Sequence, residues 1–346
     1  MHFYILDPLL DHRWDDLVAC HPRASVFHAT GWLRTLANTY DYRPIVLTST
    51  PAHQRLSDGV VFCEIRSWIT GSRLVSLPFS DHAEPLLGES GGRGELEQWV
   101  QAACSLHNWN YVELRPIFPR SEAGSRLTVS QSFWMHSLNL SPSIEKLFSN
   151  LHKSCVQRRI GHAEHQHLKY ERGASEELIR AFYGLLIITR RRLRLLPQPH
   201  AWFTNLIAAM SPNVEIRLVR KNDVPIAAIF TLRHRDTVVY KYGCSDHRFH
   251  HLGAMPLLFW KLIEETKSEG AAQIDFGRTE TNNSGLTEFK DRLGTTRTMI
   301  NYLRYPTNEK VGLAPLAWMK AARDLCSLLP SPLSSALGRL MYRHVA

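Results

Sequence analysis

The stretch from Tyr240 to Tyr302 constrains the fold more than any other part of the chain. Runs rich in β-branched and aromatic residues alternate there with segments of helical periodicity. The predicted order is strand, loop, helix, strand, short helix, strand, with the first strand and the loop from Tyr240 onward and the later elements over 256–269, 273–276, 285–290 and 299–302. Pro256 near the start of the long helix and Gly270 just after it occupy the positions that helix ends favour. The stretch therefore predicts an α/β fold.

The same order of elements is expected in both halves of the chain. In the first half, β-type runs over 45–48, 60–65, 74–77 and 111–114 accompany a helix over 94–107. In the second half, runs over 214–219, 226–232 and 237–242 precede the stretch described above. Each half thus reads as hairpin strands, a helix and a further strand, which is a repeat of topology without residue identity.

The length of 346 residues and the hydrophobic content of 44% suit about two packed domains. We place the first domain at 1–140, the second at 141–306 and a C-terminal segment at 307–346. Helices are expected between the halves: one capped by Ser141 with Pro142 at its first position, one over 175–195 and one over 202–210.

The C-terminal segment has a different character. Residues 313–329 and 333–342 predict two amphipathic helices with basic residues among Leu, Trp, Met and Val, separated by Pro330 and Pro332. Two interpretations remain open. The helices either contact an anionic membrane surface through residues 313–343 or pack on the second domain.

The net charge of +9 favours anionic partners such as nucleic acid or nucleotide phosphates, although a basic surface without a partner is equally compatible with it. The charge is clustered, in Arg190–Arg192 with Arg194, and in Lys153, Arg158, Arg159, Lys169 and Arg172.

The cysteines and histidines indicate no metal. None of the six cysteines forms a CxxC pair, and the clusters 162–167 and 247–251 among the eighteen histidines lack a carboxylate at a metal-motif spacing, which favours structural or solvated roles. The cysteine usage, the lack of a signal-peptide pattern at the start and the lack of a long apolar run predict a cytoplasmic protein, with contact at the inner face of the membrane as an extension.

Several groups of residues carry a resemblance to a known family. They are Asp275–Thr279 with Gly285, Phe289, Lys290, Gly294 and Tyr302; His152–Ile160; Thr189–Arg192 with Pro197–Pro199; and Leu77–Asp81. Together they resemble the FemAB-like aminoacyltransferases, which are similar to GNAT-type acyltransferases in fold. The resemblance implies tandem GNAT-like domains, each with a mixed, mostly antiparallel sheet flanked by helices. Family members move an aminoacyl group from charged tRNA to an amine of a peptidoglycan precursor.

The loop before the helix at 256 bears on the choice of donor. In GNAT enzymes two neighbouring strands part to hold the acyl group, and the coenzyme A pyrophosphate sits on amide N–H groups at the start of the next helix. The usual loop pattern is Arg/Gln-x-x-Gly-x-Gly/Ala. Here Arg248 and Gly253 fit that pattern, whereas His251 stands at the first glycine position. A side chain there would crowd a pyrophosphate, which disfavours acyl-CoA.

The resemblance implies that Phe289 and Lys290 line the acyl-transfer site. A fixed cation at Lys290 would stabilise the oxyanion of a tetrahedral intermediate. The alternative is a surface lysine on a short helix, with Phe289 in the core. Asp81 is a candidate acceptor for the proton of the attacking amine, although no partner for it can be read from the sequence.

The remaining candidates bind substrate. Arg158 and Arg159 suit phosphate groups because a guanidinium binds them bidentately, and a solvated helix face is the alternative. Asp275 and Arg278 flank a strand end, where ligands gather in α/β domains, or else form an internal ion pair or cap. The substrate-binding set also contains Lys153, Tyr242, Arg248 and Gly253.

The sequence thus predicts an acyltransferase that moves an aminoacyl group from charged tRNA to an amine of a nucleotide- or lipid-linked cell-envelope precursor, without a metal or a bound cofactor. An acyl-CoA-dependent N-acyltransferase of envelope polysaccharide biosynthesis is the enzyme alternative. A non-catalytic module that binds RNA or a membrane surface is the alternative of another class. No Ser-His-Asp, P-loop or dinucleotide-binding pattern supports a hydrolase, kinase or dehydrogenase.

Overall fold

The computed structural model describes residues 3–68, 71–88, 93–117, 125–306, 338 and 340–344, and all structural statements below concern these residues. They divide into two compact units. The first holds the described residues up to Ser132, together with 300–306 and 338–344. The second is Phe133–Met299. The strands β6 (Thr128–Asn139) and β12 (Thr296–Tyr305) cross the boundary between the units.

The first unit is a sheet in the order β1-β2-β3-β4-β5-β12. Neighbouring strands are antiparallel apart from the parallel pair β4–β5. The strands are β1 (Tyr4–Leu6), β2 (Arg43–Thr48), β3 (Val60–Ser67), β4 (Gly71–Val75) and β5 (Val112–Leu114). The helices are α1 (Arg13–Cys20), η1 (Val26–His28), α2 (Thr30–Tyr40) and α3 (Arg93–Leu106). The apolar face of α3, with Leu96, Val100 and Cys104, packs in one core with Phe62 and Leu74 of the sheet.

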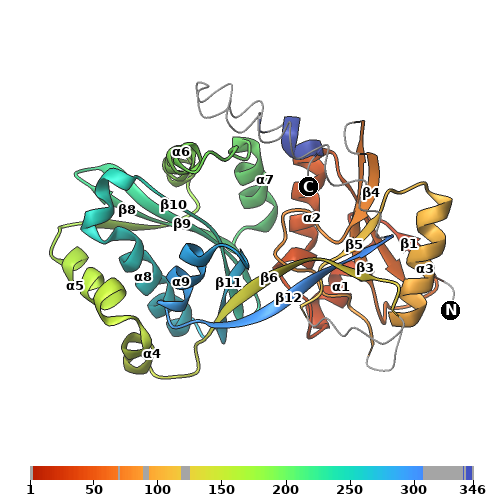
Figure 1. Cartoon of the computed structure of the whole chain (residues 1–346), viewed down its shortest axis with the longest axis horizontal. Helices are drawn as coiled ribbons and strands as arrows, with labels where there is room; N and C mark the ends of the chain where they lie inside the picture. The colour runs from red at the N-terminus through yellow and green to blue at the C-terminus, as the bar shows by residue number, and fades with distance from the viewer. Residues whose placement is uncertain are drawn as a thin grey trace. The chain divides into compact units, whose positions relative to one another are not determined.

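The second unit is a sheet in the order β6-β11-β10-β9-β8-β7 (Figure 1). Its further strands are β7 (Lys169–Gly173), β8 (Val214–Lys221), β9 (Val224–His234), β10 (Thr237–Ser245) and β11 (Gln273–Glu280). Its helices are α4 (Ile144–Asn150), the π-helix η2 (Lys153–Gln157), α5 (Arg158–Glu164), α6 (Glu176–Arg192), α7 (His200–Met210), the 3-10 helix η3 (His247–Leu252), α8 (Ala254–Ser268) and α9 (Ser284–Asp291).

Helices cover both faces of the second sheet (Figure 1). On one face, α4, α5 and α8 bury Leu147, Ile160 and Leu258 in one core with Ile229 and Ile274 of the strands. On the other face, aromatic rings of α6 and α7 pack on those of β9 and β10. Phe203 of α7 lies 5.8 Å from Phe230 and 5.2 Å from Tyr242 between ring centroids. The predicted α/β class with a mixed, mostly antiparallel sheet is confirmed.

The parallel pair β10–β11 separates part of the way along. Its register runs from Thr237↔Gln273 only to Val239↔Asp275, although both strands continue. Beyond that point β10 follows β9 to Ser245, and β11 follows β6 to Glu280. The register shifts by one residue in each strand, between Tyr240 and Tyr242 and between Asp275 and Gly277. Because a bulge bends its strand, the two bulges explain why a gap opens at the carboxyl ends, just before α8.

The structure corrects the sequence analysis at two places. Ser143, not Ser141, caps α4: its side chain accepts a hydrogen bond from the Lys146 amide, while the amide of Ser141 donates to the Asn139 side chain at the end of β6. β11 continues to Glu280, so Asp275 and Arg278 lie within the strand and do not flank its end. β6 had no predicted counterpart.

Most of the predicted C-terminal amphipathic helices lies outside the described residues. At 340–344 the chain is helical, and Met341 and His344 are buried within the first unit. The backbone oxygen of His344 accepts a hydrogen bond from Arg73 at 2.9 Å. No helix in the described part of the chain has the length and apolar character needed to span a membrane.

Candidate active site

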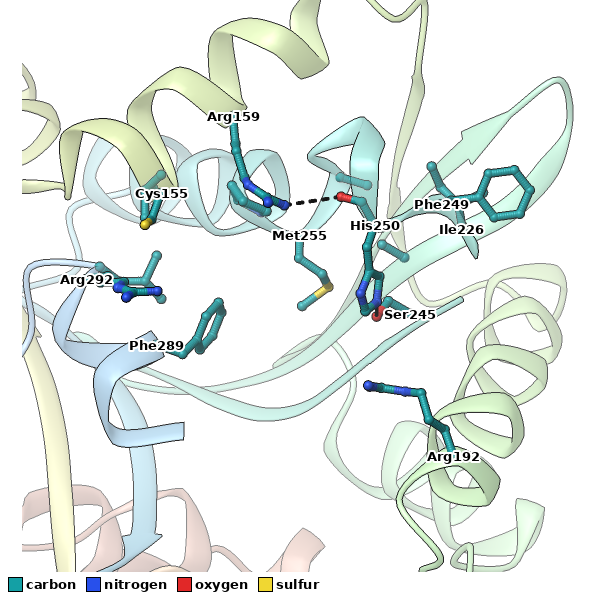
Figure 2. Close-up of a pocket in the computed structure, with 15 residues that line it drawn as sticks. Cys155, Arg159, Arg192, Ile226, Ser245, Phe249, His250, Met255, Phe289 and Arg292 are labelled. Atoms are coloured by element: carbon teal, nitrogen blue, oxygen red, sulfur yellow. Dashed lines mark hydrogen bonds between the residues drawn. The ribbon is translucent and has the colours of Figure 1, made fainter. Parts of the chain in front are cut away.

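A cavity of about 420 Å³ lies in the second unit, where β10 ends and α8 begins (Figure 2). Its walls come from segments far apart in the sequence, namely η2 and α5, the last residue of α6, β9, the end of β10, η3, the first turn of α8, and α9 with the residues after it. Apolar side chains of Met255 and Phe289 line it beside polar ones. The cavity therefore lies at the end of the sheet where β10 and β11 part.

The first turn of α8 contributes backbone N–H groups to this wall. Gly253 caps the helix with φ +76°, and no side chain caps it. The first N–H groups of a helix have no acceptor within the helix, which applies to Ala254 and Met255. Pro256 has no N–H, and the amide of Leu257 donates to the Gly253 carbonyl at 3.2 Å. The helix start thus offers an anion fewer amides than an ordinary first turn.

Three arginines, Arg159, Arg192 and Arg292, line the cavity, and none of the described carboxylates does. Figure 2 shows them coming from α5, from the end of α6 and from the residue after α9. Arg159 donates to the His250 carbonyl at 3.3 Å, and Arg292 contacts Glu288. Arg192 forms no ion pair with another residue that the structure describes. Together with the positive end of α8, these guanidinium groups give the cavity a charge that suits an anion such as phosphate.

The first turn of α5 covers the loop at Gly253. A Cβ atom placed on Gly253 would lie 2.4 Å from the carbonyl oxygen of Arg159, and the backbone there is left-handed. The glycine is therefore required by the close approach of α5. From the sequence, Gly253 was predicted to bind substrate, in a loop where glycines let a ligand approach the backbone. His251 is exposed and is not among the residues that line the cavity.

Ser245 and His250 form a hydrogen-bonded pair in the cavity wall, with 2.8 Å between Oγ and Nε2. Thr189 of α6 holds Ser245, because its Oγ1 accepts from the Ser245 amide at 2.9 Å and donates to the Ser245 carbonyl at 3.1 Å. Desolvation, followed by the charges of Arg192, His247 and Arg159, lowers the pKa of His250 below its ordinary value, while Asp246 opposes the shift. The sequence analysis missed this pair, since it treated the histidines at 247–251 as structural or solvated.

Phe289 and Lys290, the two residues implied at the acyl-transfer site, have different environments. Phe289 lines the cavity and lies 5.5 Å from the Phe259 ring. Lys290 is 3% exposed and does not line it. Its Nζ donates to the carbonyls of Gly277 and Arg278, at 3.0 and 3.1 Å, in the part of β11 that has left β10. A role for Lys290 in stabilising the oxyanion stays a prediction.

The other predicted residues are spread over several places. Arg159 lines the cavity, whereas Arg158 and Lys153 are exposed on α5 and η2 outside its lining. Arg248 is bound to Asp246 at 2.6 Å. The buried Tyr242 accepts hydrogen bonds from Gln198 and Trp202.

Asp275 stabilises the bulge in β11, because its Oδ1 accepts from the Gly277 amide at 2.6 Å. Arg278 lies 4.2 Å above the centre of the Phe133 ring. Asp81 belongs to the first unit, where its carbonyl accepts from the Tyr302 hydroxyl at 2.8 Å. None of these three residues is part of the cavity wall.

Comparisons with known proteins agree with this geometry. Residues 152–291 match the family model of the acetyltransferase (GNAT) domain. The crystal structure of FemX is similar over 92% of this chain and 99% of its own, with a TM-score of 0.69 and 13% identity. The C-terminal domain of a protein described as a lysylphosphatidylglycerol synthetase, from Agrobacterium fabrum, is similar over 90% of this chain and 95% of its own, with a TM-score of 0.58 and 14% identity.

A tandem GNAT protein from the clavulanic acid biosynthesis pathway is also similar, over 89% of this chain and 99% of its own, with a TM-score of 0.54 and 10% identity. The comparison with curated proteins found no match. Residues 152–291 are therefore a GNAT-type acyltransferase domain, in which β10 and β11 part before α8. The chain shares its fold with FemX and with the tandem GNAT protein.

Proposed function

We propose that this acyltransferase takes an aminoacyl group from charged tRNA and transfers it to an amine of a cell-envelope precursor. The observation that carries the proposal is the cavity at the end of β10, beyond the point where β10 and β11 part, which among the described residues is lined by three arginines and no carboxylate. Such a cavity suits a donor that carries phosphate beside its acyl ester. The apolar side chains of Met255 and Phe289 suit the acyl portion.

The surroundings of the cavity favour tRNA over coenzyme A as the phosphate-bearing donor. The pyrophosphate of coenzyme A needs several amides at a helix start, and Pro256 removes one of them. The contact between Gly253 and Arg159 covers part of the loop as well. The elements that form the cavity wall also carry exposed basic residues outside its lining, namely Lys153, Arg158 and Arg191, and the exposed Arg194 follows α6. A run of cations beyond the cavity suits a phosphate backbone.

The proposed chemistry needs no covalent enzyme intermediate. The amine nitrogen attacks the ester carbonyl, a C–N bond forms, and the ester C–O bond breaks to release the ribose hydroxyl. The developing oxyanion needs fixed donors or cations. For Lys290 this role stays a prediction from the sequence, because its side chain does not line the cavity. The fold shared with FemX supports an envelope precursor as acceptor, through the family resemblance.

Transfer from acyl-CoA to an amine is the second candidate. The matched family model is named for acetyltransferases, and the amides of Ala254 and Met255 remain at the start of α8. The match to the acetyltransferase (GNAT) domain supports an acyltransferase over the non-catalytic alternative. Membrane contact through residues 313–343 falls mostly outside the described residues and stays a proposal.

Donor binding tests the proposal without knowledge of the acceptor. The protein is titrated at fixed low salt with charged tRNA, uncharged tRNA and acetyl-CoA. We expect tighter binding of charged tRNA, and weaker binding of it by Arg192→Gln. Arg180→Gln is the matched control, since Arg180 lies on the same helix, is exposed and does not line the cavity. Equal, steeply salt-dependent binding of both tRNA forms would contradict the proposal, and tight acetyl-CoA binding would favour the second candidate.

A further inference from the structure

We propose that His250, acting through Ser245, accepts the proton that the attacking amine must lose during acyl transfer. The inference deepens the proposed function and rests on it. It concerns two residues that share the wall of the cavity with the three arginines. It also differs from the sequence-based expectation, which gave the proton to Asp81.

An amine becomes a nucleophile only when its nitrogen is neutral, and it carries a surplus proton after attack. A positioned base therefore accelerates the reaction. The ionisable side chains that line the cavity are three arginines, Cys155 and His250. Arginine stays protonated in proteins and cannot take up the proton. His250 is thus the lining residue that is suited to take up a proton near neutrality.

The local geometry holds the pair in place. His250 lies on η3 and its backbone carbonyl is bound by Arg159, while Ser245 is buried at the end of β10 and fixed by Thr189 through two hydrogen bonds. The 2.8 Å contact between Ser245 Oγ and His250 Nε2 is a hydrogen bond of ordinary length. Figure 2 shows the imidazole next to Ser245, with Arg192 on the opposite side of the pair from Arg159.

The charges around His250 keep it available as a base. Arg192 faces it from α6, Arg159 from α5, and His247 and Asp246 from its own segment. Desolvation and the charges of Arg192 and Arg159 favour the neutral imidazole, and Asp246 opposes them. Because the pKa lies below its ordinary value, the ring is neutral at physiological pH, and its capacity to accept a proton is lost only on acidification.

The proton balance closes without another reactant. In the tetrahedral intermediate the N–H of the attached amine donates to Ser245 Oγ, and the serine proton passes to His250 Nε2. The imidazolium then returns one proton by the same path to the leaving ribose oxygen as the C–O bond breaks. Ser245 ends unchanged, so no acyl group is attached to the enzyme.

The experiment measures enzyme-dependent discharge of total tRNA charged with radiolabelled amino acids, at saturating protein. Two amines serve as acceptor probes. Nα-acetyl-lysine is mostly protonated at pH 7, whereas methoxyamine is neutral and loses its surplus proton readily. We expect His250→Gln to slow discharge to Nα-acetyl-lysine by roughly 100-fold and discharge to methoxyamine far less, with unchanged charged-tRNA binding. Imidazole in solution should restore part of the rate of His250→Ala, and His251→Gln, at an exposed position outside the cavity, should match the wild type.

The outcomes separate the two levels of the inference. If the wild type discharges charged tRNA to Nα-acetyl-lysine and His250→Gln does so at the same rate, the role of His250 is overturned and the proposed function stands. Equal slowing with both amines and no rescue by imidazole would also overturn it, because a merely structural role predicts that pattern. If the wild type discharges charged tRNA to neither amine and binds charged and uncharged tRNA with equal affinity, the proposed function fails and this inference fails with it.

Discussion

The carbonyl oxygen of Arg159 lies 2.4 Å from the point where a Cβ atom would stand on Gly253. This relationship ties the first turn of α5 to the N-terminus of α8, and both line the cavity. An alanine at 253 would have to displace backbone, and it would hold a left-handed φ of +76°. The cavity wall therefore depends on the absence of a side chain at that position.

We expect Gly253→Ala to lower the free energy of unfolding by about 3 kcal/mol, from left-handed strain plus overpacking. Gly270→Ala is the matched control. Gly270 follows the C-terminus of α8 with φ +77° and has no atom within 4 Å of the added Cβ position. The control should cost only about 1 kcal/mol. Equal losses in chemical denaturation would show that the Arg159 contact is unimportant.

The pKa of His250 should depend on Arg192. Arg192 is the second-largest cause of the lowered pKa, after desolvation. Arg192→Gln removes a nearby positive charge that disfavours the imidazolium, so the pKa should move upward toward the ordinary histidine value. An NMR titration of the imidazole signals measures the shift directly. Arg180→Gln, which removes a charge farther along the same helix, should leave the titration unchanged.

The buried side chain of His136 is expected to make the protein less stable in acid. Its side chain is 0% exposed, and neither ring nitrogen has a hydrogen-bond partner among the described residues, although Asp291 lies 3.5 Å from Nε2. Burial, aided by Lys290 and Arg297, lowers its pKa to about 4. The unfolded chain, with a histidine pKa of about 6.5, binds more protons between these values. The stability that the neutral His136 side chain contributes is therefore fully present above about pH 6.5 and is lost as the pH falls toward 4.

Protonation of His136 should lower the free energy of unfolding by about 3 kcal/mol over that pH interval. Denaturation at a series of pH values measures it as a difference between proteins. His136→Phe should show a flatter loss of stability between pH 6.5 and 4 than the wild type. His12→Gln, at an exposed position, should show the wild-type slope. If His136→Phe loses stability with falling pH as steeply as the wild type, His136 is not the cause of the acid sensitivity.

Tyr242 should matter for stability and not for donor binding. Its hydroxyl accepts hydrogen bonds from Gln198 Nε2 and Trp202 Nε1, each at 2.9 Å, between β10 and the helix region around α7. Tyr242→Phe leaves these two buried donors without that acceptor, at a cost of about 1–3 kcal/mol. Charged-tRNA affinity at low temperature should stay at the wild-type level. A fall in affinity with normal stability would instead support the substrate-binding role predicted from the sequence.

Local patterns predicted the elements of the second unit but not the details of the site. The helix predicted from Pro256 begins at Ala254, and the strand predicted over 237–242 extends to Ser245. β6 was missed because serine residues interrupt its apolar alternation, so that Phe133, Met135 and Leu138 do not stand out. Length and boundaries of strands depend on pairing partners, which a single sequence does not reveal.

The pair of Ser245 and His250 shows why site residues are harder to predict. Neither residue type nor spacing marks the pair, since histidines also stand at 247 and 251. What distinguishes His250 is the turn of η3 that brings its ring to the end of β10 and under the charges of α5 and α6. Lys290 is the opposite case. A motif identified this residue, but in the fold its ammonium group is buried and donates to two backbone carbonyls.

Lys290 is expected to act by fixing the end of β11. Lys290→Met keeps the length of the side chain but removes the two hydrogen bonds to the Gly277 and Arg278 carbonyls. We expect a loss of about 1–3 kcal/mol in the free energy of unfolding. Charged-tRNA affinity should be unchanged, because Lys290 is not part of the cavity lining. The rate of discharge to Nα-acetyl-lysine should fall as the parted strand loses its position. Lys261→Met on α8, at a side chain that is 39% exposed, provides the control. A rate loss at Lys290→Met without any loss of stability would instead favour a direct role of the ammonium at the oxyanion.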